Sequence, residues 1–170
     1  MARVVDSTGA LLEPEIRLAD SLVRRERVGD ASMTELLKPA QMRFLERRHD
    51  AEIVIEAVDM LRATWGSLYH RAVSEQVCDQ GLQEERLTMV VSGWTVTGHP
   101  DLYLDGDLHD FKCTSVWSVI LGDKAQDEQQ LNLYAYAYEQ AYRFEVRRLF
   151  NCYRFFDWMR SKARAGDGYP

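Results

Sequence analysis

The sequence predicts a mixed α/β domain in which helices flank a central sheet and an antiparallel hairpin lies within that sheet. Apolar side chains recur at helical spacing over much of residues 14–78. Residues 87–119 change to an alternation of apolar and polar side chains, with frequent Thr and Val. The dipeptide Asp105-Gly106 interrupts this alternation, as is typical of a hairpin loop. A change from helical to period-two spacing indicates helices combined with a sheet.

The chain has the length of one domain, which we predict to span residues 1–170. Hydrophobic residues make up 46% and charged residues 28%, as in globular proteins and unlike disordered or fibrous ones. No apolar run approaches the roughly 18 to 20 residues that span a bilayer, and no secretory signal follows Met1. Three cysteines without a CxxC pair indicate neither disulfides nor a cysteine-rich zinc site. We therefore expect a soluble, cytoplasmic protein with reduced thiols and no membrane partner.

The formal net charge of −6 is unevenly distributed along the chain. Residues 66–140 carry 12 acidic and 4 basic side chains, whereas residues 141–170 carry 3 acidic and 7 basic ones. Carboxylates in the middle would suit divalent cations, and the basic side chains after them would suit phosphates. The plainer interpretation is an acidic solvated face beside a basic end.

Helices are expected first. Apolar spacing predicts an amphipathic helix over residues 14–28, which Gly29 ends. Ser32 and Glu35 have the spacing of a capping box and predict the start of a short helix, which Pro39 interrupts or restarts.

A longer helical region is expected over residues 41–78, with one or more breaks, and Gly81 ends it. Residues 1–65 are therefore assigned to an N-terminal helical region. The first strand follows at residue 87, where apolar side chains begin to alternate with polar ones.

Two further strands are predicted over residues 94–104 and 108–119, joined by the Asp-Gly loop. Asp123 can cap a helix over residues 124–143, and residues 146–156 have the pattern of a last strand. The predicted order is helices, three strands, a helix and a strand.

The hairpin register brings two acidic side chains together. If Asp105-Gly106 forms a two-residue loop, Asp101 lies directly opposite Asp110. Two carboxylates about 5 Å apart on one face destabilise a sheet unless a positive charge lies between them. A divalent metal ion would provide that charge.

Because side chains alternate along a strand, Lys112 projects from the same face as Asp110 and is expected opposite His99. Such a set suits hydrolysis of a phosphodiester, which needs oxygen ligands for Mg²⁺ or Mn²⁺, an activated water and a cation. The alternative loop, Gly106-Asp107, shifts the register and leaves a plain Asp101–Lys112 ion pair on a surface hairpin.

Four short motifs in this order resemble the PD-(D/E)XK nuclease superfamily, in its RecB-type and phage-exonuclease branch. The stretch from Met33 to Pro39 also resembles the first segment of phage members. The four motifs are Gly66-Ser67-Leu68-Tyr69-His70, Gly98-His99-Pro100-Asp101, the D-x-K triplet Asp110-Phe111-Lys112, and the QxxxY signature from Gln130 to Tyr134.

The resemblance implies a metal-dependent deoxyribonuclease with a restriction-endonuclease-like catalytic core over residues 66–156. It implies that Mg²⁺ or Mn²⁺ is held by His70, Asp101, Asp110 and the backbone carbonyl of Phe111. The catalytic residues that it implies are Asp101, Asp110, Lys112, Gln130 and Tyr134. Gln130 and Tyr134 are four residues apart on one helix face, where they would contact the lysine, the DNA backbone or an end nucleotide.

Gly66 and His70 also share a helix face, and the glycine would let that helix approach the sheet closely enough for the imidazole to reach a metal. Taken alone, a helical histidine is more often a core or surface residue, and only the carboxylate pair favours a ligand. Most tyrosines of the helix over residues 124–143 are expected to face the core.

Departures from the family pattern are few. Cys113 stands where many relatives have threonine, and three cysteines at these spacings predict no iron–sulfur cluster. Further acids, Glu75, Glu84 and Glu85, are assigned as supporting groups around the site or as solvated charges. Residues 157–170 form a basic C-terminal end, and the resemblance implies further structure after it, so we expect a minimal or truncated version.

The functional prediction is an exonuclease of phage type that acts at DNA ends, in a bacterial host cell and of phage or prophage origin. DNA is the predicted partner, and a second copy of the chain or a recombination protein is also left open. Two alternatives remain: an inactive nuclease fold kept as a DNA-binding or protein-interaction module, and an acidic protein whose Asp-Gly hairpin is only structural.

Overall fold

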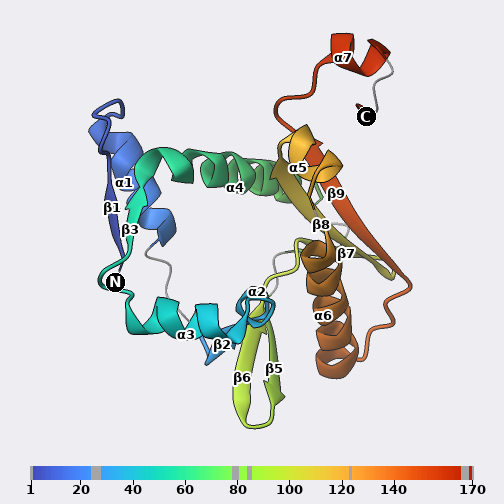
Figure 1. The fold of residues 1–170 in the computed structure, drawn as a ribbon. Helices are drawn as coiled ribbons and strands as arrows, with labels where there is room; N and C mark the ends of the chain where they lie inside the picture. Colours follow the sequence, from blue (N-terminus) through green and yellow to red (C-terminus); the bar gives the residue numbers. More distant parts are fainter. Residues whose placement is uncertain are drawn as a thin grey trace.

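The computed structural model describes residues 2–23, 28–77, 81–83, 86–122, 124–165 and 169. Within these ranges the chain forms three small sheets and seven helices (Figure 1), which confirms the predicted mixed α/β class. The helices are α1 (Glu13–Val23), α2 (Met33–Leu36), α3 (Ala40–Arg48), α4 (Ala57–Val77), α5 (Val116–Ile120), α6 (Ala125–Tyr142) and α7 (Arg160–Ala165).

The four-stranded sheet is mixed, with strand order β4-β7-β8-β9; β4 and β7 are antiparallel, as are β7 and β8, whereas β8 and β9 are parallel. A three-stranded sheet has the order β2-β6-β5, and β1 pairs with β3. The strands are β1 (Arg3–Val5), β2 (Ala31–Ser32), β3 (Val54–Glu56), β4 (Leu82–Gln83), β5 (Leu87–Val91), β6 (Trp94–Gly98), β7 (Leu102–Leu104), β8 (Asp107–Thr114) and β9 (Arg148–Phe155).

The β7–β8 hairpin has the predicted Asp105-Gly106 loop, because Leu104 pairs with Asp107. Both loop residues have positive φ, 48° for Asp105 and 86° for Gly106, as a type I′ turn requires. Arg147 closes the turn from the side: its guanidinium donates to the Asp105 carbonyl and its backbone N–H to the Gly106 carbonyl. The alternative Gly106-Asp107 loop is therefore wrong.

The predicted strand over residues 94–104 is in fact two strands in two different sheets. Pro100 lies between them and has no N–H to donate to a ladder, so pairing stops on both sides. The β7–β8 ladder consequently ends at Leu102 opposite His109, one residue short of Asp101. The expected pairing of His99 with Lys112 does not form, and His99 instead accepts a hydrogen bond from Arg86 at 3.3 Å.

The strand predicted over residues 108–119 ends earlier, at Thr114. Ser115 begins α5, since its hydroxyl accepts a hydrogen bond from the backbone N–H of Trp117. The last strand and α6 lie within two residues of their predicted bounds. Asp123, the predicted cap of α6, lies outside the described residues.

The N-terminal prediction is right in its helices and wrong in omitting strands. The capping box forms, with Glu35 N–H donating to the Ser32 hydroxyl and Ser32 N–H donating to the Glu35 carboxylate. Strands β1, β2 and β3 are two or three residues long, too short for a periodic pattern to reveal. In particular, β3 separates α3 from α4 within the expected helical region. The described part of α1 ends at Val23, and residues 24–27 lie outside the described ranges.

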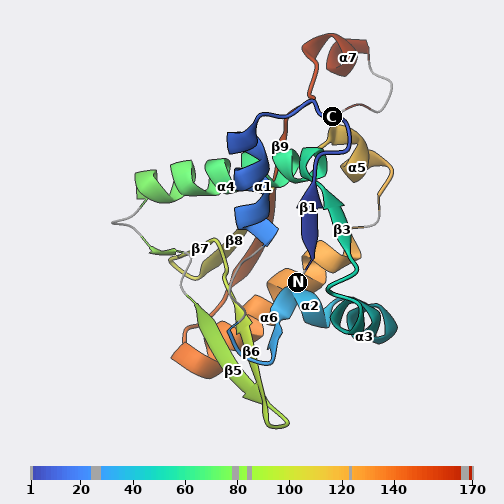
Figure 2. The same cartoon turned by 90° about the vertical axis from the view of Figure 1, so that its left-hand side faces the viewer.

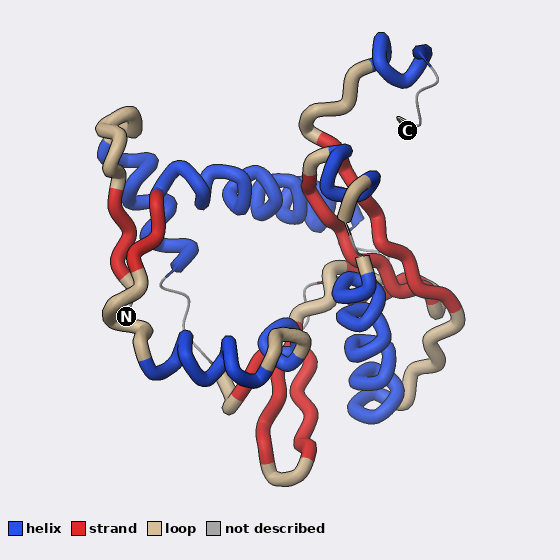
Figure 3. The backbone as a smooth tube through the Cα atoms, viewed as in Figure 1, coloured by secondary structure: helices blue, strands red, loops and turns tan. Residues whose placement is uncertain are grey.

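Helix α4 connects the N-terminal elements to the four-stranded sheet. In Figures 1 and 3, β1, β3 and α1 stand at one end of α4, and β8 and α5 stand near its other end. Figure 2 shows the β5–β6 hairpin pointing away from α4. Because α4 begins at Ala57, the predicted boundary between residues 65 and 66 falls inside this helix. None of the described helices has an apolar stretch long enough to cross a membrane.

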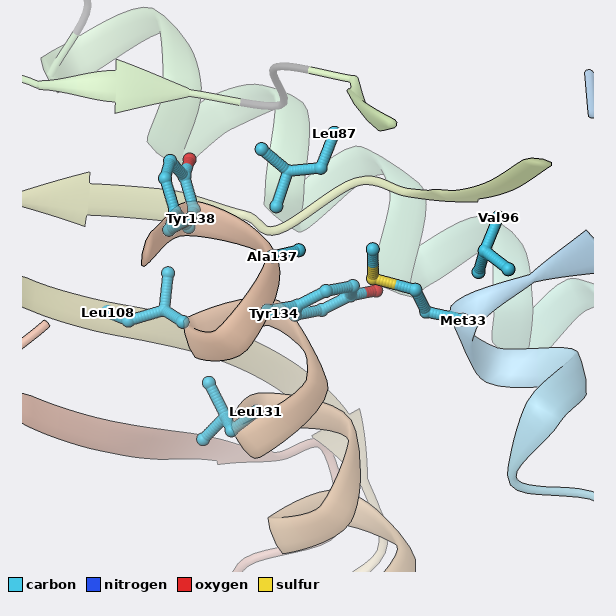
Figure 4. Packing of buried hydrophobic residues seen from close by; sticks show 8 residues of the cluster. All are labelled: Met33, Leu87, Val96, Leu108, Leu131, Tyr134, Ala137 and Tyr138. Carbon is cyan, nitrogen blue, oxygen red and sulfur yellow. The ribbon is translucent and has the colours of Figure 1, made fainter. Parts of the chain in front are cut away.

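The core lies between α6, the strand β8 and the β5–β6 hairpin. Figure 4 shows that it joins side chains from distant parts of the sequence, with Tyr134 of α6 reaching Met33 of α2. Leu108 and Tyr138 are fully buried at its centre. The core therefore fixes the position of α6 relative to β8, and both elements contribute residues to the candidate site.

Candidate active site

The two faces of β8 supply different parts of the site. Asp110 and Lys112 point toward α6, because Lys112 donates to Gln130 of that helix. Phe111 lies on the opposite face, where its ring contacts Tyr69 of α4 edge-on at 6.0 Å between centroids. Side chains of α4 can therefore contact the backbone of Phe111, whereas the side chains of Asp110 and Lys112 face α6.

His70 of α4 links the Phe111 backbone to Asp101. Its Nε2 lies 2.7 Å from the Phe111 carbonyl oxygen, and its Nδ1 lies 3.1 Å from Asp101 Oδ1. The other oxygen of Asp101, Oδ2, accepts the Phe111 N–H at 2.5 Å. Asp101 thus replaces the ladder partner that Phe111 lacks at the end of β7, which brings this carboxylate beside the residue next to Asp110.

Asp110 lies in a second network with α6. Its Oδ2 is 2.7 Å from Lys112 Nζ, which also donates to Gln130 Oε1 at 2.9 Å. The Gln130 amide donates to the Tyr134 hydroxyl at 2.9 Å and, at a longer 3.4 Å, to Asp110 Oδ1. The spacing of four residues between Gln130 and Tyr134 places both on the face of α6 that meets β8.

The electrostatics of Asp110 and His70 follow from these contacts. Asp110 is only 2% exposed, and burial raises the pKa of its carboxyl above the ordinary value although Lys112 opposes the shift. The nearby Asp101 carboxylate contributes to the same rise. The hydrogen bond to Asp101 raises the pKa of His70, against the effect of burial. Asp101 therefore affects Asp110 electrostatically although the two are not paired in the ladder, as the hairpin register had predicted them to be.

Two buried oxygen atoms test whether the site suits a cation. Asp110 Oδ2 is in ion-pair contact with Lys112 Nζ at 2.7 Å. Asn151 Oδ1 lacks a hydrogen-bond donor, and Asn151 lies opposite Asp110 in the β8–β9 ladder. Because directly paired residues project from the same face, an unsatisfied acceptor lies beside a buried carboxylate, and a divalent cation could bind both side chains.

The donor set on the other side is compatible with the same ion. His70 Nε2 and the Phe111 carbonyl oxygen lie 2.7 Å apart, and Nε2 donates its hydrogen to that carbonyl in this structure. Both atoms could bind one cation once that proton has left, because a metal-ligating imidazole nitrogen is deprotonated. In the described ranges, His, Cys, Asp and Glu side chains alone form no group of three or more at metal spacing. The fit therefore depends on including the backbone carbonyl of Phe111, which the motif resemblance had implied.

Every predicted site residue lies in one of these two adjoining networks. His70, Asp101 and Phe111 form one, and the other joins the remaining predicted residues, Asp110, Lys112, Gln130 and Tyr134. The fold thus assembles the whole predicted set, whereas the roles assigned to its members remain predictions.

Other sequence inferences about the site fare differently. Gly66 is not needed for a close approach, because a Cβ there would meet only Cys113 Cβ at 3.9 Å, an ordinary contact. Glu75 forms an exposed ion pair with Arg71, in agreement with a solvated charge. Glu84 and Glu85 lie outside the described residues.

The structure adds one residue, Asn151, that sequence reasoning missed, and a contact of Arg154 that it did not anticipate. Asn151 is brought beside Asp110 only by the parallel pairing of β8 with β9. Arg154 donates to the Tyr69 hydroxyl at 2.8 Å and so ties β9 to α4, the helix that carries His70. The basic character of the C-terminal part was the one available signal for Arg154, and no local pattern marks Asn151.

Comparison with known proteins supports a shared fold and gives no information about activity. No protein-family model matches the chain, and no curated protein matches it. Among solved structures, the crystal structure of SSO0001 is similar with a TM-score of 0.57 and 12% sequence identity, covering 85% of this chain and 71% of the other. At that identity the similarity shows a shared fold alone.

Proposed function

We propose that this protein is a metal-dependent nuclease that hydrolyses phosphodiester bonds of DNA. The observation that carries the proposal is the buried Asp110 carboxylate, held against Lys112 at 2.7 Å and close enough to the Asp101 carboxylate for the two charges to interact. A carboxylate kept inside the protein beside a lysine and an unsatisfied acceptor is an unusual structural element, because burial of such groups destabilises the fold. Arrangements of this kind concentrate at functional sites.

The proposed ligands of Mg²⁺ or Mn²⁺ are His70 Nε2, the Phe111 carbonyl oxygen and the carboxylates of Asp101 and Asp110. Bound there, a divalent cation supplies Lewis-acid chemistry, lowering the pKa of an attacking water and offsetting phosphate charge. Asp101 has a second task, since its bond to Nδ1 orients the imidazole so that Nε2 faces the Phe111 carbonyl.

Lys112 supplies the positive charge for the phosphate in this proposal. Its ammonium is restrained by Asp110 on one side and Gln130 on the other, so it is oriented before substrate binds. Burial raises the pKa of Tyr134 to about 12, which keeps its phenol protonated. The phenol then accepts the Gln130 amide N–H, and this bond fixes the amide so that its oxygen faces Lys112.

The second candidate is a nuclease fold retained as a binding module. One observation favours it: both ring nitrogens of His70 and both oxygens of Asp101 already have hydrogen-bond partners within the chain. Such a closed network holds together without an ion.

Incubation of linear and circular DNA with Mg²⁺, Mn²⁺ or EDTA separates the two candidates. The nuclease proposal predicts metal-dependent loss of DNA that Asp110→Asn or Lys112→Ala reduces at least 10²-fold, the scale for losing one charge-stabilising group. Asp107→Asn is the matched control on the same strand, because Asp107 pairs with Arg148 at the hairpin end.

Loss of linear DNA alone would support action at ends, as in the phage exonucleases whose motifs the chain resembles. Cleavage that survives both site substitutions would remove the assignment. DNA that binds and stays intact with every metal favours the binding module.

A further inference from the structure

An apolar groove lies outside the candidate active site. It is a cavity of about 470 Å³ between the β5–β6 hairpin, α6 and the α2–α3 segment. Its walls include Met89 and Val91 of β5, Trp94 of β6, Leu133 and Tyr136 of α6, and a single charged residue, Arg43 of α3. Figure 1 shows the hairpin and α6 running side by side at the end of the molecule away from α4.

Arg43 is the feature that makes the groove selective. Its side chain is partly buried, and its Nε is shielded from solvent without any hydrogen-bond partner in the described part of the chain. A buried donor left unpaired destabilises the fold, and a carboxylate oxygen is the strongest acceptor that a protein can offer it. Neighbouring cations are already engaged, since Lys38 pairs with Glu46 and Arg47 donates to the Asp30 carbonyl.

The rim of the groove has the composition of a protein-binding surface. Trp94 and Tyr136 are 53% and 52% exposed although both line the cavity. Tryptophan, tyrosine and arginine are the residues that most often dominate binding energy at protein interfaces.

We propose that this groove binds a segment of a partner protein that places a large apolar side chain next to a carboxylate. The apolar side chain fills the cavity between Trp94, Leu133 and Tyr136, and the carboxylate accepts the N–H of Arg43. A nucleic-acid strand fits less well, because successive phosphates need several cations and the lining offers one.

A second copy of the chain fits less well too. The acidic and apolar segment at Asp157 and Trp158 is exposed at Trp158, but Asp157 already accepts hydrogen bonds from Ser115 and Val116 at the start of α5. Using that carboxylate elsewhere would uncap α5. That segment of a second copy is therefore unsuited to the groove, and the proposed partner is a different protein; a second copy bound through another segment is an outcome of the test.

The test uses the full chain and two short fluorescein-labelled peptides, one with a tryptophan flanked by glutamates and the other with the same tryptophan flanked by lysines. Fluorescence anisotropy should show that the glutamate peptide binds more tightly. Arg43→Glu should weaken its binding by about 10- to 100-fold, as expected for a charged hydrogen bond, and should reverse the preference toward the lysine peptide. Arg48→Glu, on the same helix and exposed, is the matched control and should leave the preference unchanged.

Each other outcome overturns the proposal. Absence of binding by both peptides, equal affinity for the two, or an equal effect of the two arginine substitutions would remove it. Displacement of the peptide by a single-stranded oligonucleotide, lost in Arg43→Glu, would assign the groove to nucleic acid. A mass that doubles with protein concentration and falls on peptide addition would assign it to a second copy. Circular dichroism of Arg43→Glu checks that the variant is folded.

Discussion

The N-terminal elements and the sheet with α6 are built from the same kinds of residues but bury them differently. Among described residues before β3, the buried side chains are three alanines and Met33, whereas Leu12, Phe44 and several other large apolar side chains are exposed. Around α6 the buried set contains leucines and tyrosines. Because burial of large apolar groups is the main source of stability, the two regions should differ in resistance to local opening.

The site lies where these regions meet. His70 belongs to α4, which packs against α1, whereas Asp110, Lys112 and Gln130 belong to the well-buried part. The charged residues around Asp110 therefore lie in the region with the larger buried core. His70 instead lies on α4, which packs against the less buried helix α1. Because the two regions meet at the site, its integrity depends on the contact between α4 and β8.

The largest expected effect comes from truncating the core. Leu108 is fully buried between β8 and α6, and Leu108→Ala should lower the free energy of unfolding by about 2–5 kcal/mol. Leu12, which is 70% exposed, is the matched control, and Leu12→Ala should change that free energy by no more than about 0.5 kcal/mol. Urea unfolding of both variants measures the contrast. Similar losses would mean that the two regions contribute alike.

A smaller effect is expected at the contact between α2 and α6. A Cβ at Gly98 would lie 2.6 Å from Met33 Sδ and 2.7 Å from Tyr134 Cε1, so Gly98→Ala should overpack this contact and cost about 1–3 kcal/mol. Combining it with Met33→Ala removes one of the colliding side chains. The double variant should then lose less free energy than the sum of the two single variants. Strict additivity in urea unfolding would show that the N-terminal segment does not bear on α6.

Unlike Gly98, Gly66 on α4 has room for an added Cβ. A Cβ there meets no atom closer than Cys113 Cβ at 3.9 Å, and alanine favours a helix over glycine. Gly66→Ala should therefore raise the free energy of unfolding by about 0.5–1 kcal/mol and leave the position of His70 unchanged. A loss of stability, together with weaker metal binding by calorimetry, would mean that the helix must approach the sheet more closely.

The smallest effect concerns acid stability at the end of β9. The hydrogen bond from the Ser115 hydroxyl, with that from the Val116 N–H, lowers the pKa of Asp157 below its ordinary 3.8. A carboxyl with a lowered folded-state pKa stabilises the fold above pH 3.8, and this contribution is lost as the pH falls through the folded-state pKa. Asp157→Asn should flatten the loss of stability below pH 3.8. An unchanged acid slope in thermal unfolding would mean that the cap does not form in solution.

Much of the fold was accessible from local patterns. The Asp105-Gly106 loop, the capping box at Ser32 and the bounds of α6 follow from short-range chemistry that acts within a few residues, so the sequence indicates them directly. The short strands β1 and β3 are held by pairing with each other across some fifty residues, and no local pattern reports such a partner.

The site divides in the same way. Residue type and motif order singled out His70, Asp101, Lys112 and Gln130, and the structure brings them together. The predicted pairing of Asp101 with Asp110 does not form, because the ladder ends at Leu102. The hydrogen bond between Lys112 and Gln130 was among the contacts expected from the spacing on the helix face. The partner of Asp101 was not, because Pro100 ends the ladder and frees Asp101 to bind the Phe111 N–H. Asn151 was also hidden, since its place beside Asp110 depends on the register between β8 and β9.

The sequence by itself determined the Asp105-Gly106 turn, the capped helices and the charged residues that are candidates for one site, because each is recognised from neighbours a few positions away. Only the tertiary structure decided which atoms of those residues face one another, and it alone formed the groove around Arg43. The physical reason is that both depend on packing between elements far apart in the chain, where burial and strand pairing outweigh local preference.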